Sequence, residues 1–91
     1  MVDRLATLTV ADFAARRGER FRIASAFEAE LVEVSEIPRE PGGRAPFSLV
    51  LEGGPTPPLP QGIHRVEHPE LGAMELFLVP VAPGRYEVVF S

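Results

Sequence analysis

The sequence contains no cysteine, lysine, asparagine or tryptophan, and its nine basic residues are all arginines. Without cysteine the chain cannot form disulfides, thiolate zinc sites, iron–sulfur clusters or thiol nucleophiles, and nothing indicates an oxidising compartment. The thirteen acidic residues bring the net charge to −4. Proteins that bind nucleic acids gain much of their affinity by neutralising phosphates. We therefore expect no nucleic-acid partner.

Long apolar runs are missing as well. The chain has no stretch near the roughly 20 apolar residues that a membrane-spanning helix needs, so we expect no membrane partner. The opening residues, MVDRLATLTVADF, lack the basic-then-apolar pattern of a signal peptide, which favours a cytoplasmic protein. A chain of 91 residues predicts a single domain, 1–91, with one modest core.

The first part of the chain, residues 1–18, is predicted to form a lead-in segment and a short helix. Thr9 suits the N-cap, and Asp12 follows three residues later at capping-box spacing. Phe13 begins an apolar face, and Gly18 suits the position after the helix. A basic cluster follows this face: Arg16, Arg17, Arg20 and Arg22. We interpret it as a solvated helix end, with a phosphate-binding patch as the alternative.

From residue 19 to residue 91 the apolar pattern has a period of two, which predicts short antiparallel strands. We expect strands at about 19–25, 30–37, 47–52, 63–68, 73–81 and 85–90. A turn is expected around Ala26 to Glu28, and a β-bulge near Leu31 explains a slip in the alternation. The predicted fold class is mainly β (α+β): a short N-terminal helix packed on a six-stranded antiparallel meander that forms a small barrel or a strongly curved sheet.

Glycine and proline mark the connections between these strands. The segments His68 to Gly72 and Ala82 to Arg85 are predicted turns, because each offers proline early and glycine late. Residues 38–45 read as a loop by composition. The segment 53–62 holds four prolines, which force an extended path. We expect it to cross the end of the barrel, although Pro57 to Pro60 also matches ligands of proline-recognising modules.

The two histidines are the first candidates for chemistry. His64 and His68 lie on one strand face, and their four-residue spacing separates them by roughly 13 Å. Ligands of one metal must lie far closer, with bonds of about 2.0–2.1 Å, so we expect no metal and no cofactor. His68 precedes Pro69, and we expect it to hydrogen-bond the turn that follows. A small enzyme using either histidine with a glutamate is a weaker alternative.

The remaining polar residues form no catalytic constellation. Glu67, Glu70 and Glu75 surround the turn after the fourth strand, but nothing in the sequence supplies a cleft for an acid–base pair. The serines lie outside any Gly-x-Ser-x-Gly elbow, and the glycine pairs match no phosphate-binding motif. We therefore expect no catalytic residue and no enzymatic activity.

The fifth predicted strand is apolar on both faces. Met74, Leu76 and Leu78 form one face, while Phe77 and Val79 begin the other. A half-exposed antiparallel strand normally carries polar residues on its outer face, so something must cover this one. The cover is either the N-terminal helix or a protein partner, including a second subunit. The residues of this possible interface are Val50, Phe77, Val79, Val81 and Val89.

Three segments resemble a small bacterial single-domain family of unknown function: the Leu-Thr-x-x-Asp-Phe start, residues 43–49 (GRAPFSL), and the PQGIxRxEHPELG hairpin at residues 60–72. The resemblance covers nearly the whole chain and is most specific in the hairpin. The family has no assigned activity, so the resemblance implies no catalytic residue. We associate its members with gene neighbourhoods encoding phage-tail-like collar or fibre proteins, which implies a role in an assembly.

These observations favour a non-enzymatic protein-interaction or structural accessory module. We expect a homodimer or a component of a phage-tail-like or other multiprotein assembly. The alternative is a small-ligand-binding β barrel whose mouth lies at the proline-rich loop, although no feature points to a particular small molecule. The residues expected to serve a ligand or partner at that loop are Pro58, Leu59, Pro60, Gln61, His64, Arg65, His68 and Tyr86.

Overall fold

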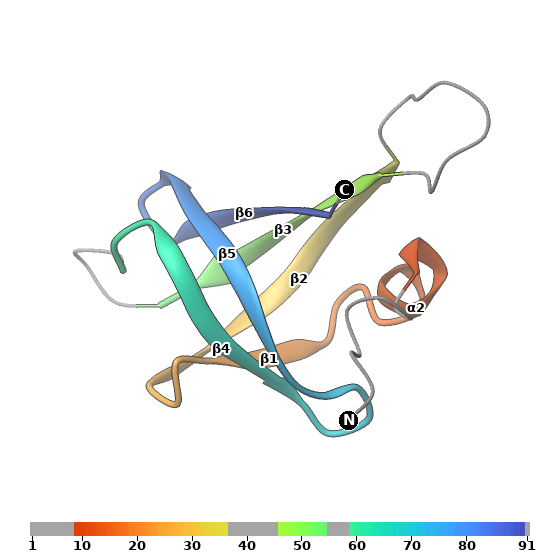
Figure 1. Ribbon diagram of the computed structural model, residues 1–91, viewed down its shortest axis with the longest axis horizontal. Coiled ribbons are helices and arrows are strands. Elements are labelled where there is room, and N and C mark those ends of the chain that lie inside the picture. Colours follow the sequence, from red (N-terminus) through yellow and green to blue (C-terminus); the bar gives the residue numbers. More distant parts are fainter. Residues whose placement is uncertain (1–8, 37–45, 55–58, 91) are drawn as a thin grey trace.

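The computed structural model describes residues 9–36, 46–54 and 59–90. In this part of the chain six antiparallel strands form a closed barrel, and one short helix precedes them (Figure 1). This arrangement confirms the predicted fold class. The elements are α2 (Val10–Ala14), β1 (Arg20–Ile23), β2 (Phe27–Glu36), β3 (Phe47–Gly53), β4 (Gly62–His68), β5 (Gly72–Ala82) and β6 (Arg85–Phe90). Strands β3 to β6 begin and end within one residue of the predicted limits. The predicted loop at 38–45 lies outside the described residues.

The order of the strands around the barrel is β1-β2-β3-β6-β5-β4. The expectation of one continuous meander is therefore wrong, because the chain forms two three-stranded meanders, β1 to β3 and β4 to β6. The connection between them carries the chain from β3 to a position beside β1. Antiparallel pairing of β4 with β1 and of β6 with β3 then closes the barrel.

The barrel interior is lined by apolar side chains that alternate with outward-facing residues along each strand. Barrels of about eight strands have an interior just wide enough for side chains to fill, and this barrel has only six strands. The interior therefore serves as the hydrophobic core. Its members, including one residue from the helix, are Phe13, Phe21, Ile23, Ala29, Leu31, Phe47, Leu49, Leu51, Val66, Leu71, Met74, Leu76, Leu78, Tyr86, Val88 and Phe90.

The β2–β3 pairing contains the predicted bulge. Leu31 lies opposite Leu51, but the next paired residue on β2 is Glu33, opposite Val50. One extra residue on β2 restores the alternation, so that Val34 packs partly against the core.

The turn between β1 and β2 lies earlier than predicted. It occupies Ala24 to Ala26, and the Ala26 amide donates a hydrogen bond to the Ile23 carbonyl (2.9 Å). Ala24 and Ser25 have φ values of 53° and 54°, the left-handed conformation that a type I′ hairpin turn requires. Asparagine and glycine usually occupy such positions, so the sequence AS gives no sign of the turn.

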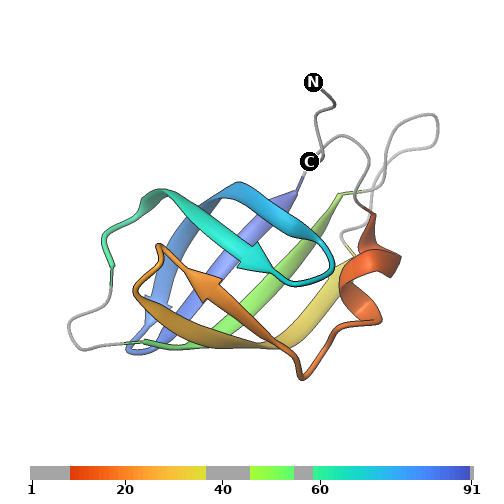
Figure 2. The ribbon, with the colours of Figure 1, turned by 90° about the horizontal axis from the view of Figure 1, so that it is seen from below.

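The helix α2 closes one end of the barrel (Figure 2). Its first turn is held by the Asp12 carboxylate, which accepts a hydrogen bond from the Thr9 amide (2.8 Å), as the capping-box spacing predicts. Phe13 is fully buried, and its ring centroid lies 5.2 Å from that of Phe90, 5.8 Å from that of Phe47 and 6.4 Å from that of Phe21. Each of these contacts falls within the range of favourable aromatic pairs.

The expectation that this helix covers the second face of β5 is wrong. A five-residue helix offers one large apolar side chain, and Phe13 inserts between rings at the barrel end instead. The outward residue Phe77 of β5 is 48% exposed. Among the described residues, no helix has the length and the apolar character that crossing a membrane requires.

We expect Phe13→Ala to lower the free energy of unfolding by about 3–5 kcal/mol, because it leaves a cavity among the aromatic rings. Urea denaturation followed by circular dichroism measures this loss. Val10→Ala is the matched control, since this side chain lies in the same helix and is only partly buried, and its cost is expected to stay below about 1.5 kcal/mol. Equal costs for the two variants would contradict the closing role of Phe13.

We expect Ser25→Gly to raise the free energy of unfolding. Glycine removes a left-handed strain of about 1–2 kcal/mol, and the extra freedom of the unfolded chain offsets about 0.4–1 kcal/mol of that gain. The urea midpoint measures the difference. Ser35→Gly, within β2, serves as the control and is expected to destabilise the protein. A Ser25→Gly protein less stable than the parent would show that the turn is not strained.

Candidate functional site

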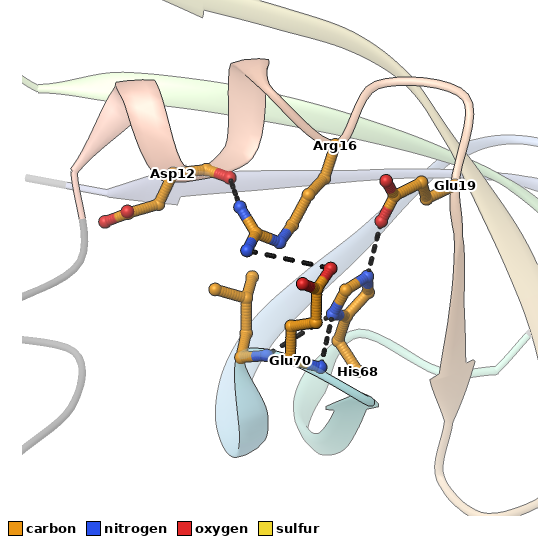
Figure 3. A network of polar contacts seen from close by, with 6 residues as sticks. Asp12, Arg16, Glu19, His68 and Glu70 are labelled. Carbon is orange, nitrogen blue, oxygen red and sulfur yellow. Dashed lines mark hydrogen bonds and ion pairs between the residues drawn. The ribbon is translucent and has the colours of Figure 1, made fainter.

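The buried imidazole of His68 organises the turn between β4 and β5 (Figure 3). Its Nδ1 accepts hydrogen bonds from the backbone amides of Glu70 (3.1 Å) and Leu71 (3.3 Å). The ring therefore does what an aspartate or asparagine side chain does in an Asx-turn, where a side-chain acceptor satisfies amides two or three residues later. The turn contact expected from the His68-Pro69 sequence is present.

The other ring nitrogen reaches a residue far away in the sequence. Because Nδ1 accepts two amide hydrogens, we assign the ring proton to Nε2. Nε2 then donates to the Glu19 carboxylate at 2.7 Å. The backbone of Glu19 is itself fixed, since its carbonyl accepts from the Leu31 amide (2.9 Å). His68 thus ties the β4–β5 turn to the start of β1.

Arg16 completes this network from the helix side. Its guanidinium donates to the Asp12 carbonyl (2.8 Å) and lies 3.8 Å from the Glu70 carboxylate, so that it links α2 to the same turn (Figure 3). The side chain is only 20% exposed. Arg16 is therefore not part of a solvated basic cluster, contrary to the prediction from the sequence. Arg20, another member of that cluster, points outward on β1 and lies 3.8 Å from Glu28.

The geometry of the network does not fit a metal ion. Glu19, His68 and Glu70 do offer ligand atoms within 4.8 Å of one another. However, an ion on Nε2 would move the ring proton to Nδ1, where two backbone amides already point their hydrogens. The imidazole is also 3% exposed. The three residues are better explained as a structural clamp.

At the other end of the barrel, residues predicted to form a ligand mouth fasten the chain before β4. The Leu59 amide donates to the Tyr86 hydroxyl (2.8 Å), and the His64 Nε2 lies 2.9 Å from the Pro60 carbonyl. Tyr86 is buried inside the barrel, where its ring packs 6.2 Å from that of Phe27.

Among the seven predicted loop-site residues that the structure describes, Leu59 meets Tyr86 and Pro60 meets His64, but the seven do not form one cluster. His64 and His68 lie at opposite ends of β4. Arg65 points outward, 3.5 Å from Glu67. Gln61 is exposed, and Pro58 lies outside the described residues.

The wall of the barrel carries the second notable feature, an apolar surface that we call the outer apolar face. On the described strands it comprises Val50, Ile63, Phe77, Val79, Val81 and Val89. Ile63 is 65% exposed, Val89 56%, Val81 52% and Phe77 48%, while the other two are partly buried. The five residues predicted as an interface therefore all face outward.

Ile63 is the member that the sequence reading missed. It shares one face of β4 with Arg65 and Glu67, so the sequence alone indicates a polar face there. In the barrel it lies directly opposite Phe77, and this cross-strand pair adds it to the apolar surface. Only the register between β4 and β5 reveals the contact.

Charged residues border the outer apolar face on both sides. Arg65 lies opposite Glu75 on one side. On the other side, the Arg85 guanidinium is 3.5 Å from Glu52. Glu87 is the charged residue closest to the middle, because it lies opposite both Val79 and Val50. The apolar surface is thus limited by charges of both signs.

Comparison with known proteins matches the chain to a family model. The family model described as "Domain of unknown function (DUF6916)" matches residues 8–90. No curated protein and no solved structure matches the chain.

We expect His68→Ala to destabilise the protein more than His68→Asn. Alanine leaves the Glu70 and Leu71 amides without their acceptor, at about 1–3 kcal/mol for each buried group that stays unsatisfied. Asparagine keeps an acceptor for the turn, whereas both variants lose the Glu19 contact and the packing of the ring, whose centroid lies 4.7 Å from that of Phe21. Thermal and urea unfolding of the two variants measure the difference. Equal losses would mean that the turn amides do not depend on residue 68.

Proposed function

The chain belongs to the DUF6916 family, a domain of unknown function, and we propose that it acts as a non-enzymatic protein-interaction module. The observation that carries this proposal is the outer apolar face. Large apolar side chains that gather on the wall of a soluble barrel, inside a charged border, are typical of a protein–protein contact.

Typical patch areas give the order of magnitude of the free energy that such a contact would gain. Exposed apolar patches that mark interaction sites measure a few hundred Å² or more, and their burial contributes roughly 25 cal/mol per Å². The gross gain is therefore on the order of 5–10 kcal/mol. Association costs an estimated 4–15 kcal/mol, so a partner must add contacts to the charged border. We propose a contact that includes Arg65 and Glu87 in addition to the apolar residues.

The polar residues support a role without catalysis. In the His68 network both ring nitrogens already have partners within the chain, the Glu19 carboxylate on one side and the turn amides on the other. The imidazole is also shielded from solvent, so neither ring nitrogen is available to a substrate in this arrangement. A ligand site at the other end of the barrel has less support, since Tyr86 and His64 there bond to the chain itself.

An interaction module of this kind suits a component of a larger assembly. A phage-tail-like structure is one such assembly, and the resemblance of the hairpin at residues 60–72 favours it. The proposal itself needs only a protein that contacts the outer apolar face.

Site-specific photocrosslinking tests the proposal. We expect a photoreactive phenylalanine at position 77 to give one adduct of defined mass in the native cell. The same side chain at position 20, which is also on the outer wall, should give none, and Val89→Glu should suppress the adduct at position 77. Identical patterns at both positions, or no adduct at position 77, would contradict a docking role for this face.

A further inference from the structure

The further inference concerns the partner, and it rests on the proposed function. We propose that the outer apolar face binds a second copy of the chain as a symmetric dimer, with Phe77 at the two-fold axis. Arg65 of each copy then lies opposite Glu87 of the other.

Phe77 lies on β5, the strand that carries three of the six members of the outer apolar face. On β4, Ile63 lies opposite Phe77, and Arg65 is two residues further along, opposite Glu75. The strand on the other side of β5 is β6, where Glu87 lies opposite Val79. Starting from Phe77, Arg65 is therefore one strand away and two residues toward Glu75. Glu87 is one strand away on the other side and two residues toward Val79.

The two charges thus lie on opposite sides of Phe77 and at matching offsets. When two copies face each other, their two-fold axis must lie in the plane of the contact. We place this axis through Phe77 and perpendicular to the line that joins Arg65 and Glu87. Rotation about the axis then brings Arg65 of one copy opposite Glu87 of the other, and Glu87 of the first copy opposite Arg65 of the second. The result is an isologous interface, in which the same pair forms twice.

The chemistry of the two groups suits this pairing. The Arg65 side chain is 59% exposed, and its contact with Glu67 uses Nε, which leaves the terminal nitrogens of the guanidinium as further donors. Glu87 lies between Val79 and Val50, where its carboxylate gains from an arginine that arrives with the partner. A partner of one charge sign would match only one of the two groups, whereas a second copy matches both.

Typical areas of interfaces and of exposed apolar patches indicate how strong such a dimer would be. Stable interfaces bury about 800 Å² on each partner, and exposed apolar patches of this kind measure a few hundred Å². The border charges must therefore supply the remaining contact. We expect a reversible dimer whose population depends on protein concentration and on the two Arg65–Glu87 pairs.

Analytical ultracentrifugation of charge-reversal variants tests the proposal. Arg65→Glu places two glutamates opposite each other, and Glu87→Arg places two arginines opposite each other. Each variant alone should dimerise more weakly than the parent by over about tenfold. Mixed in equal amounts, the two variants should form a heterodimer with parental affinity, because both of its pairs are again of opposite sign.

Two further proteins complete the experiment. The double variant Arg65→Glu/Glu87→Arg in one chain should dimerise like the parent, which guards against a single variant that fails to fold. Arg20→Glu reverses a charge on the wall away from this surface and should leave the dimer unchanged. Circular dichroism checks the fold of each protein.

The possible outcomes separate the two proposals. Restored dimers in the mixture and in the double variant support the pairing, since no change within one chain produces rescue by mixing. A parent that sediments as a monomer at every concentration, or a mixture that stays monomeric, overturns the symmetric dimer. A position-specific adduct at residue 77 to another protein would in that case still support the docking role of the face.

Discussion

The packing of Phe13 among the rings of Phe21, Phe47 and Phe90 is the contact on which the helix end of the barrel depends. A barrel closes its sides by hydrogen bonding but leaves its ends open, and the aromatic rings at this end would otherwise meet water. Insertion of one side chain from a short helix removes them from solvent. It also brings Arg16 close to the β4–β5 turn, and it leaves the helix unable to cover the wall of the barrel. The insertion of Phe13 thus explains both why this end of the barrel is closed and why the outer wall of the barrel stays exposed.

The sequence predicted those features that arise from local patterns. Alternating burial placed the strands, and the broken alternation near Leu31 placed the bulge, because both depend on side chains that lie next to one another along one strand. Glycine in a turn has a similarly local meaning, as Gly84 with its positive φ shows. The turn between β1 and β2 was predicted two residues too late, because Ala24 and Ser25 are held in a left-handed conformation by the pairing of the strands on either side and not by their own preference.

Features that depend on distant pairing were beyond the reach of the pattern. The Glu19 carboxylate meets His68 across 49 positions of sequence, and the contact follows from the pairing of β1 with β4. Ile63 belongs to the outer apolar face for a similar reason, since only the β4–β5 register places it beside Phe77. The outward positions of Phe77, Val79 and Val81 on β5, in contrast, were predictable because a strand that is apolar on both faces cannot bury both of them in one barrel.

The division of the barrel into two three-stranded meanders has a consequence for how the chain reaches this structure. Within each meander, pairing joins strands that are consecutive in sequence, so each half depends mainly on short-range contacts. The pairings of β3 with β6 and of β1 with β4 join strands from different halves, and the entropy lost in closing a loop grows with its length. The slow, topology-limited part of folding therefore falls on these two seams, and the rate at which the barrel forms is set by the meeting of its halves.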